Sequence, residues 1–302
     1  MVAQVGHPCW QTPRREGCES PHPGLWPRSG TLAASAEAVT LTAMCLLVFA
    51  WQTEPAYALV VAANRDERFE RPAHSLCVLR ERDPRILGGR DDLAGGTWLA
   101  VNQHGVVAGL TNRPAPGGRD LSKRSRGELP LMAAEQRTAH DAVHELARRV
   151  NPGDYNPAWL LVADRNSLHY VEIAADRSPS FRQLPPGIHI LENVALGEPS
   201  LKIDRVRSLM SGASGQGRSL WTAMPAVLAD HTVPTPGPAT GEMTGEVERP
   251  PATLASCVHT DDYGTRSAVL VRVPIDPAAR PEMAVADGPP CTTPFIDVSL
   301  RM

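Results

Sequence analysis

A cysteine at position 45 follows Met44 and begins the apolar run of residues 45–51. If Met44 and the residues before it are absent from the mature protein, Cys45 carries a free α-amine beside its thiol. The amine can then act as the base for the thiol of the same residue, which makes a nucleophile without a second side chain. An α-amine titrates near pH ~8 and a thiol near ~8.5, so both groups are useful close to neutral pH. The sequence therefore predicts an N-terminal cysteine nucleophile.

The densest polar run in the chain is Asn64-Arg65-Asp66-Glu67, directly after the apolar residues 57–63. We expect these four side chains at the exit of a buried strand, a position where catalytic groups are common. The alternative interpretation is a turn closed by local ion pairs.

Three further polar residues accompany apparent turns and strand ends. Asn112 follows the apolar hairpin pattern of residues 98–110, and Asn193 precedes a helix start marked by proline. Arg266 enters an apolar run at residues 267–273. Together with the polar run at residues 64–67, these residues move the balance toward a functional site and away from a simple turn.

Several dispersed motifs, in this order along the chain, resemble the NRDE family. They are Met44-Cys45, Asn64–Glu67 followed by Arg71-Pro72, Gly95–Trp98, Leu110–Asn112 and Tyr263–Arg266. The family includes the eukaryotic transport and Golgi organisation protein 2, and the resemblance covers roughly residues 44–273. The family in turn resembles N-terminal nucleophile hydrolases of the choloylglycine hydrolase type.

The resemblance implies an α+β fold with four layers, αββα, like the sandwich of N-terminal nucleophile hydrolases. The cysteine would lie on a central strand of that sandwich. We expect residues 44–302 to form one such domain. Residues 1–43 are rich in proline and show no helical or strand period. We therefore expect them to be a non-native or disordered extension.

The resemblance also implies roles around the thiol. Cys45 would be the nucleophile, and Arg65 would favour its anionic form. Asp66 would hydrogen-bond the α-amine and fix its direction, a role that Glu67 could share or take.

The remaining residues would bind the oxyanion or the substrate. The resemblance implies that Asn112 donates to the oxyanion, that Asn193 does likewise or binds substrate, and that Arg266 adds positive charge. Substrate contacts are predicted for Asn64, Glu67 and Trp98, the last being equally interpretable as a core residue or a pocket wall.

Apolar patterning predicts the main elements of this domain. Expected strands are residues 45–51, 57–63, 98–102, 106–110, 159–163, 168–173 and 267–273. Expected helices are residues 128–149, 200–210 and 220–230, and residues 232–251 are expected to form a surface loop.

Composition bears on which partners and which cellular compartment the protein is expected to have. The net charge of −3 over 302 residues gives no electrostatic case for nucleic acid or an anionic membrane. No apolar run approaches the ~20 residues of a membrane span, and the N-terminus does not read as a signal peptide. The cysteine usage argues for reduced thiols, so we predict a cytoplasmic protein. Six cysteines show no regular spacing, and Cys77 and Cys257 are expected to be packing residues.

Metal and cofactor sites are not predicted. His140 and His144 are spaced like zinc ligands on a helix, but the acid between them is Asp141 and no third ligand is evident. The leading hypothesis is thus a cofactor-free hydrolase or acyltransferase acting on an amide or related acyl bond of a small molecule. Two alternatives stay open: a non-catalytic protein that binds haem, a lipid or another hydrophobic ligand in trafficking, and a structural partner-binding domain. Neither the substrate nor the oligomeric state follows from the sequence.

Overall fold

Two antiparallel sheets form the centre of the computed structural model, which describes residues 45–115, 117–215, 219–235 and 250–301. The predicted extension, residues 1–43, lies outside these ranges. The first sheet has the order β10-β1-β2-β11-β12-β13. Its strands are β1 (Cys45–Glu54), β2 (Tyr57–Arg68), β10 (Gly187–Leu191), β11 (Tyr263–Pro274), β12 (Glu282–Ala286) and β13 (Ile296–Asp297).

The second sheet runs in chain order from β3 to β9. Its strands are β3 (Ala73–Arg80), β4 (Ile86–Asp91), β5 (Leu99–Asn102), β6 (Val107–Asn112), β7 (Ala158–Ala163), β8 (Leu168–Ile173) and β9 (Ser180–Gln183). The helices are α1 (Glu128–Ala134), α2 (Ala139–Arg149), α3 (Leu201–Gly215) and α4 (Leu220–Leu228), with short 3₁₀ turns at Pro251–Leu254 and Ser299–Arg301.

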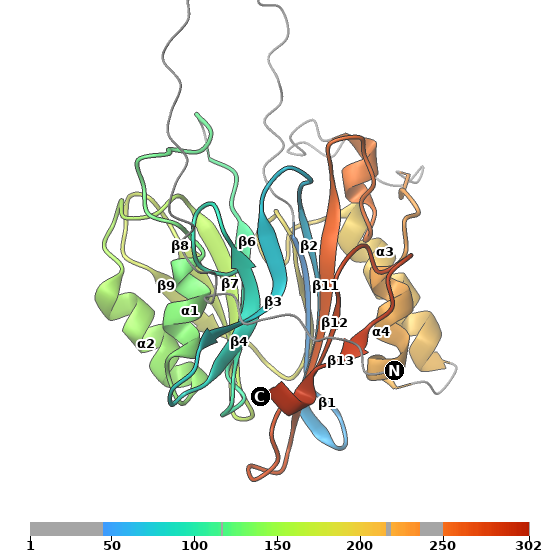
Figure 1. The fold of residues 1–302 in the computed structure, drawn as a ribbon, viewed down its shortest axis with the longest axis horizontal. Helices are drawn as coiled ribbons and strands as arrows, with labels where there is room; N and C mark the ends of the chain where they lie inside the picture. Colours follow the sequence, from blue (N-terminus) through green and yellow to red (C-terminus); the bar gives the residue numbers. More distant parts are fainter. Residues whose placement is uncertain (1–44, 116, 216–218, 236–249, 302) are drawn as a thin grey trace, which may run out of the picture.

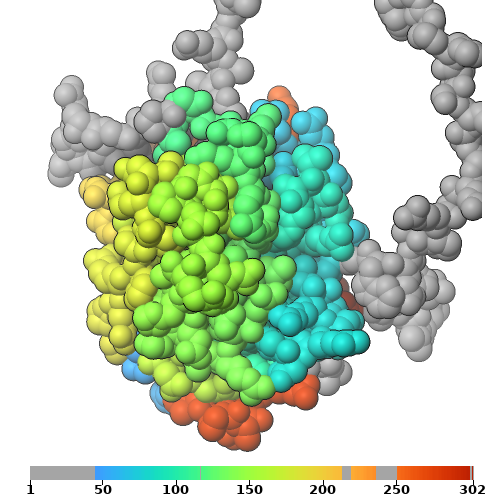
Figure 2. Space-filling view, turned by 90° about the vertical axis from the view of Figure 1, so that its left-hand side faces the viewer, coloured from blue at the N-terminus to red at the C-terminus, as the bar shows by residue number. Residues whose placement is uncertain are grey.

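The sheets face each other, and helices cover the outer face of each (Figure 1). Side chains such as Phe49 and Leu161 form one apolar layer between the sheets. A second layer joins the first sheet to α3 and α4, and a third joins the second sheet to α1 and α2. Helices α1 and α2 lie on the side of the molecule that faces the viewer in Figure 2. This arrangement confirms the predicted four-layer αββα sandwich.

Both faces of β1 and β2 are buried, which explains their nearly continuous apolar sequences. Leu47 and Phe49 pack into the layer between the sheets, whereas Leu46 and Val48 pack toward α3 and α4. Because successive side chains alternate in a strand, each residue of this central pair has a predictable face.

The prediction of a single helix over residues 128–149 is wrong, because two helices occupy that range. The buried side chain of Asn102 donates hydrogen bonds to the carbonyl oxygens of Ala134 and Gln136, which end α1. Thr138 then caps α2 by accepting a hydrogen bond from the backbone N–H of Asp141. The apolar stripe runs through both helices, so periodicity alone does not reveal the break.

The other helices and the two predicted hairpins are confirmed, β5 with β6 and β7 with β8. Strands β3, β4, β9, β10, β12 and β13 were not predicted from the sequence. Most of the predicted loop at residues 232–251 lies outside the described residues. In the described part of the chain, no helix is long and apolar enough to cross a membrane.

Candidate active site

Cys45 is the first described residue of the central strand β1, and it lies directly opposite Arg65 of β2. Its side chain is buried, with 7% exposed. On the other side of β1, Leu47 pairs with Leu191 of β10, so the same register continued by two residues brings Asn193 opposite Cys45. Pairing with β2 at Cys45, and with β10 from Leu47 onward, therefore fixes the position of this end of β1.

The polar run after residue 63 does not lie at a strand exit, as predicted, but within β2, which continues to Arg68. The strand continues because β11 pairs with it as far as Arg68. Strand alternation then divides the run between two faces. Arg65 and Glu67 share the inter-sheet face with Cys45, whereas Asn64 and Asp66 face the helical layer.

Arginine and carboxylate side chains form a chain of ion pairs on the inter-sheet face. Glu67 Oε2 lies 3.7 Å from Arg65 Nη2 and 3.4 Å from Arg71 Nε. Arg71 Nη2 lies 2.7 Å from Asp91 Oδ2. Glu67 thereby joins Arg65, which lies opposite the thiol, to Arg71.

Arg126, which no sequence motif singles out, also belongs to this group. Burial and the neighbouring Arg119 lower the pKa of Arg126 to about 10, whereas the Cys45 thiol and Glu67 act in the opposite direction. Its Nη1 donates to the carbonyl oxygen of Pro157 at 3.2 Å. A second arginine therefore lies within electrostatic range of Cys45.

On the helical face, Asp66 is fully buried between β11 and α3. Its Oδ1 accepts a hydrogen bond from Thr265 Oγ1 at 2.6 Å, and its Oδ2 lies 3.7 Å from Lys202 Nζ. That separation is too long for a hydrogen bond, and neither atom has such a partner among the described residues. Burial raises the pKa of Asp66 to about 6, although Lys202 and Thr265 act to lower it. Lys202 was not predicted, and its only signal is that it is one of two lysines in the chain.

Burial is also the main cause that raises the pKa of the Cys45 thiol, to about 12. The Asp66 carboxylate adds to the increase, while Arg65 and the backbone N–H of Asp66 oppose it. In the full chain the nitrogen of Cys45 is a peptide nitrogen and not a base. The thiol in this state is therefore neutral near pH 7.

The two predicted oxyanion donors lie together at the end of the sandwich that holds Cys45. Asn193 Nδ2 donates to the carbonyl oxygen of Asn112 at 2.7 Å. Gly109 brings β6 close to β1, since a Cβ at this position would lie 2.9 Å from Leu47 Cδ1. A side-chain amide has two donor hydrogens, and the bond to Asn112 uses one of those on Asn193.

The last three predicted residues have supporting contacts in this structure. Asn64 Nδ2 donates to the carbonyl oxygens of Leu228 and Ser256, at 2.9 and 2.7 Å, and so joins β2 to the end of α4. Trp98 is buried in the layer between the sheets. Arg266 Nη1 donates to three backbone carbonyl oxygens of the turn after β2, those of Arg68, Phe69 and Arg71. The roles of these residues in substrate binding or catalysis stay predictions.

The arrangement has the parts needed for acyl transfer by a thiol. A sulfur nucleophile faces guanidinium groups that favour its anion, a buried carboxylate lies behind it, and two asparagines meet nearby. The missing part is a base, which a free α-amine on Cys45 would supply.

Comparisons with known proteins give a consistent family. Among curated proteins, the chain is 31% identical over 253 residues to the Transport and Golgi organization protein 2 homolog of Bos taurus, covering 77% of this chain and 90% of the relative. The corresponding Homo sapiens protein is 30% identical over 253 residues, which also cover 77% of this chain and 90% of that relative.

Solved structures with a similar fold share little sequence. A Caenorhabditis elegans ortholog of N-acylethanolamine-hydrolyzing acid amidase has a TM-score of 0.46 and 13% identity, covering 78% of this chain and 94% of that one. A mutant of conjugated bile acid hydrolase from Clostridium perfringens has a TM-score of 0.48 and 11% identity, with coverages of 84% and 92%.

The profile of the family described as Transport and Golgi organisation 2 matches residues 44–277. This range begins immediately before Cys45 and ends after β11, so it contains every residue of the candidate site. The chain belongs to the Transport and Golgi organisation 2 family.

Proposed function

We propose that this protein is an N-terminal cysteine hydrolase or acyltransferase that acts on an amide or related acyl bond of a small molecule. The observation that carries the proposal is the register of the central strands, which puts Cys45 opposite Arg65 and next to the buried Asp66. A structural cysteine in an apolar core would not need charged groups on both faces of the adjacent strand.

The reaction would begin when the free α-amine of Cys45 takes the proton of the thiol. The thiolate then attacks the carbonyl carbon, forming a C–S bond while the carbonyl π electrons move to oxygen. Side-chain N–H groups of Asn112 and Asn193 would stabilise this oxyanion, each by about 3 kcal/mol in the transition state. The protonated amine gives its proton to the leaving nitrogen as the C–N bond breaks. Water, or a second amine in acyl transfer, then releases the acyl group and restores the thiol.

The charged residues would set the protonation states that this sequence needs. Arg65 and Arg126 both favour the thiolate by Coulomb attraction. Asp66 has a carboxylate oxygen without a hydrogen-bond partner in the described chain, and an ammonium group on Cys45 would be a suitable partner. No step requires a metal ion or an organic cofactor.

The test begins with the intact mass of the untagged protein from its native host. We expect a mass that corresponds to a chain beginning at Cys45. That protein is then treated with an acyl β-lactone probe, and the modified residue is identified by peptide mass spectrometry. The proposal predicts a thioester on Cys45 that hydroxylamine removes, and no acylation in Cys45→Ala. A mature chain that retains residues 1–44 would remove the amine base and contradict the mechanism.

A second candidate is a protein that binds a hydrophobic ligand, such as haem or a lipid, without turnover. The observation in its favour is the neutral, buried thiol of the full chain, whose pKa is raised to about 12. Equilibrium binding separates the candidates, because a carrier should bind its ligand equally well after Cys45→Ala. Unreacted probe together with unchanged binding would support the carrier.

A further inference from the structure

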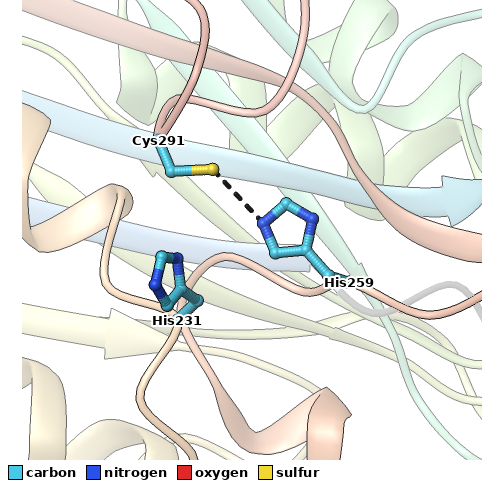
Figure 3. Close-up of side chains that lie close together, drawn as sticks. All are labelled: His231, His259 and Cys291. Carbon is cyan, nitrogen blue, oxygen red and sulfur yellow. Dashed lines mark hydrogen bonds between the residues drawn. The ribbon is translucent and has the colours of Figure 1, made fainter.

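Four side chains that commonly bind metals meet at a place distinct from the Cys45 site. Ligand atoms of His231, His259 and Cys291 all lie within 4.8 Å of one another. Figure 3 shows these three side chains grouped, with the Cys291 thiol directed at the His259 ring. Cys291 Sγ is 3.3 Å from His259 Nε2. The fourth side chain is Cys257, whose Sγ lies 3.4 Å from His259 Nε2 and 3.8 Å from Cys291 Sγ.

The four residues come from three segments that are far apart in the chain. His231 follows α4, Cys257 and His259 precede β11, and Cys291 follows β12. Sequence separations of 32 and 34 residues divide Cys291 from His259 and from Cys257. The cluster therefore matches no local metal-binding motif.

Backbone contacts hold two of these segments together. The N–H of Cys257 donates to the carbonyl oxygen of Asp230, the neighbour of His231, at 2.9 Å. Both carboxylate oxygens of Asp230 accept from Arg205 of α3, at 3.0 and 3.1 Å. His231 and Cys257 are thus presented by anchored backbone.

Three spacings among the sulfur and nitrogen atoms agree with edges of a tetrahedral zinc site, and His231 lies within 4.8 Å of His259 and Cys291. Zn–S bonds of about 2.3 Å and Zn–N bonds of about 2.0 Å give ligand–ligand separations of about 3.3 to 3.8 Å. The three separations among Cys257, His259 and Cys291 fall in this interval. Thiolate and imidazole ligands together favour zinc over magnesium or calcium, which prefer oxygen.

We propose that His231, Cys257, His259 and Cys291 form a zinc-binding site. Four protein ligands leave no open position for substrate, so the ion has a structural role. Binding replaces the proton of each thiol by the metal, and one proton per cysteine is released to solvent. The exposed histidines give the ion access from solvent. This assignment differs from the sequence prediction of no metal and of Cys257 as a packing residue.

The zinc site would stabilise the segment of residues 256–259, which contacts Thr265 and Asn64 on the helical face of the first sheet. Val258 lies between two of the ligands and exchanges two hydrogen bonds of 2.9 Å with Thr265, through its N–H and its carbonyl oxygen. Thr265 in turn donates to Asp66, and Ser256 accepts from Asn64. Zinc therefore joins three loops at the segment that supports the buried carboxylate. The inference is independent of whether Cys45 is a nucleophile.

The test uses the full chain, produced without a histidine tag, with zinc in the medium and a thiol reductant throughout. Elemental analysis after gel filtration should give about one zinc ion per chain. Replacement by Co²⁺ should produce the visible absorption of tetrahedral cobalt and a thiolate-to-metal charge-transfer band. The cobalt spectrum needs no variant, so it remains informative if a variant fails to fold.

Two variants and one matched control locate the ion. His231→Ala and Cys291→Ser should each lower the zinc content at least about tenfold under chelating wash, since removal of a ligand typically weakens zinc binding strongly. The double variant His140→Ala/His144→Ala removes another exposed histidine pair, with Nε2 atoms 3.2 Å apart, and should keep its zinc. Circular dichroism checks that each variant is folded.

Three results would overturn the proposal. One is wild-type protein without zinc and without a cobalt spectrum, and another is full zinc content in folded Cys291→Ser. The third is a Cys257–Cys291 disulfide in protein isolated under reducing conditions, because the thiols would then be unavailable as ligands.

Discussion

Two thiol-containing regions of this protein differ in the groups that surround the sulfur. Cys45 is buried between the sheets, with Arg65 opposite and Asp66 behind the strand. Cys291 is half-buried in a loop, with two exposed histidines and a second thiol as neighbours. Carboxylate and guanidinium groups are suited to setting the charge of a nucleophile, whereas imidazole and thiol groups are suited to sharing a cation. The environment of a cysteine thus indicates its chemistry better than the residue type does.

The largest expected effect tests whether the Cys45 region holds a nucleophile. Cys45→Ala should lower acyl-transfer activity of the mature protein by about 10³-fold or more, because no other group replaces the nucleophile. The measurement is the rate of amide or acyl-probe hydrolysis. The exposed variant His144→Ala serves as the control with unchanged rate. Equal rates in Cys45→Ala and wild type would exclude the cysteine mechanism.

The next effect concerns the buried charge behind Cys45. Lys202→Met should lower the free energy of unfolding by about 3–5 kcal/mol at pH 8, since the Asp66 carboxylate loses its counter-charge in a water-free site. Urea denaturation measures this loss. The only other lysine, Lys123, provides the matched control, and Lys123→Met should change stability by less than about 0.5 kcal/mol. Similar effects of both substitutions would show that Asp66 does not depend on Lys202.

The same carboxylate gives a pH dependence with a defined sign. The pKa of Asp66 is raised from 3.8 to about 6, so between these values the folded chain holds a proton that the unfolded chain has lost. The contribution of this group to the free energy of unfolding is therefore full below 3.8 and falls as pH rises through about 6. Asp66→Asn should remove this dependence. An unchanged slope in the variant would assign the titration to another group.

Metal removal tests whether the cluster around Cys291 binds a cation. A zinc chelator should lower the free energy of unfolding of the wild type by about 2.7 kcal/mol if free zinc was previously about 100 times its Kd. Thermal unfolding of Cys291→Ser should not respond to the chelator. A similar response in both proteins would show that the chelator does not act at this cluster.

The smallest effect sharpens the electrostatic account of Cys45. Arg65→Gln should raise the pKa of the thiol and slow its alkylation by iodoacetamide about tenfold for each pKa unit. Peptide mass spectrometry gives the rate for Cys45 alone. Arg68 is the control, because it pairs with Asp262 in solvent, and Arg68→Gln should leave the rate unchanged. If Arg65→Gln also leaves it unchanged, Arg65 does not tune the thiol.

Much of the fold follows from local sequence patterns. Long apolar runs predict β1 and β2 because strands buried on both faces require apolar residues on both faces. The short outer strands β9 and β13 are largely exposed and carry no such pattern, so they were missed. The division between α1 and α2 was also missed, since it depends on hydrogen bonds from the distant residue Asn102.

The candidate site shows a similar limit. Cys45, Arg65 and Asp66 could be identified because short motifs contain them. The division of Arg65 and Asp66 between the two faces of β2 could not be predicted, because the strand was expected to end before them. Arg126 and Lys202 lie outside the motifs, and only packing brings them to the site.

The sequence by itself determined which residues can do chemistry and which runs form the central strands, since side-chain type and apolar periodicity are local properties. Tertiary structure alone decided which side chains lie next to these residues. Strand register set Cys45 opposite Arg65, burial raised the pKa of Asp66, and three separate loops assembled the cluster around His259. These features depend on distances between residues remote in the chain, and such distances exist only after the sheets and helices have packed.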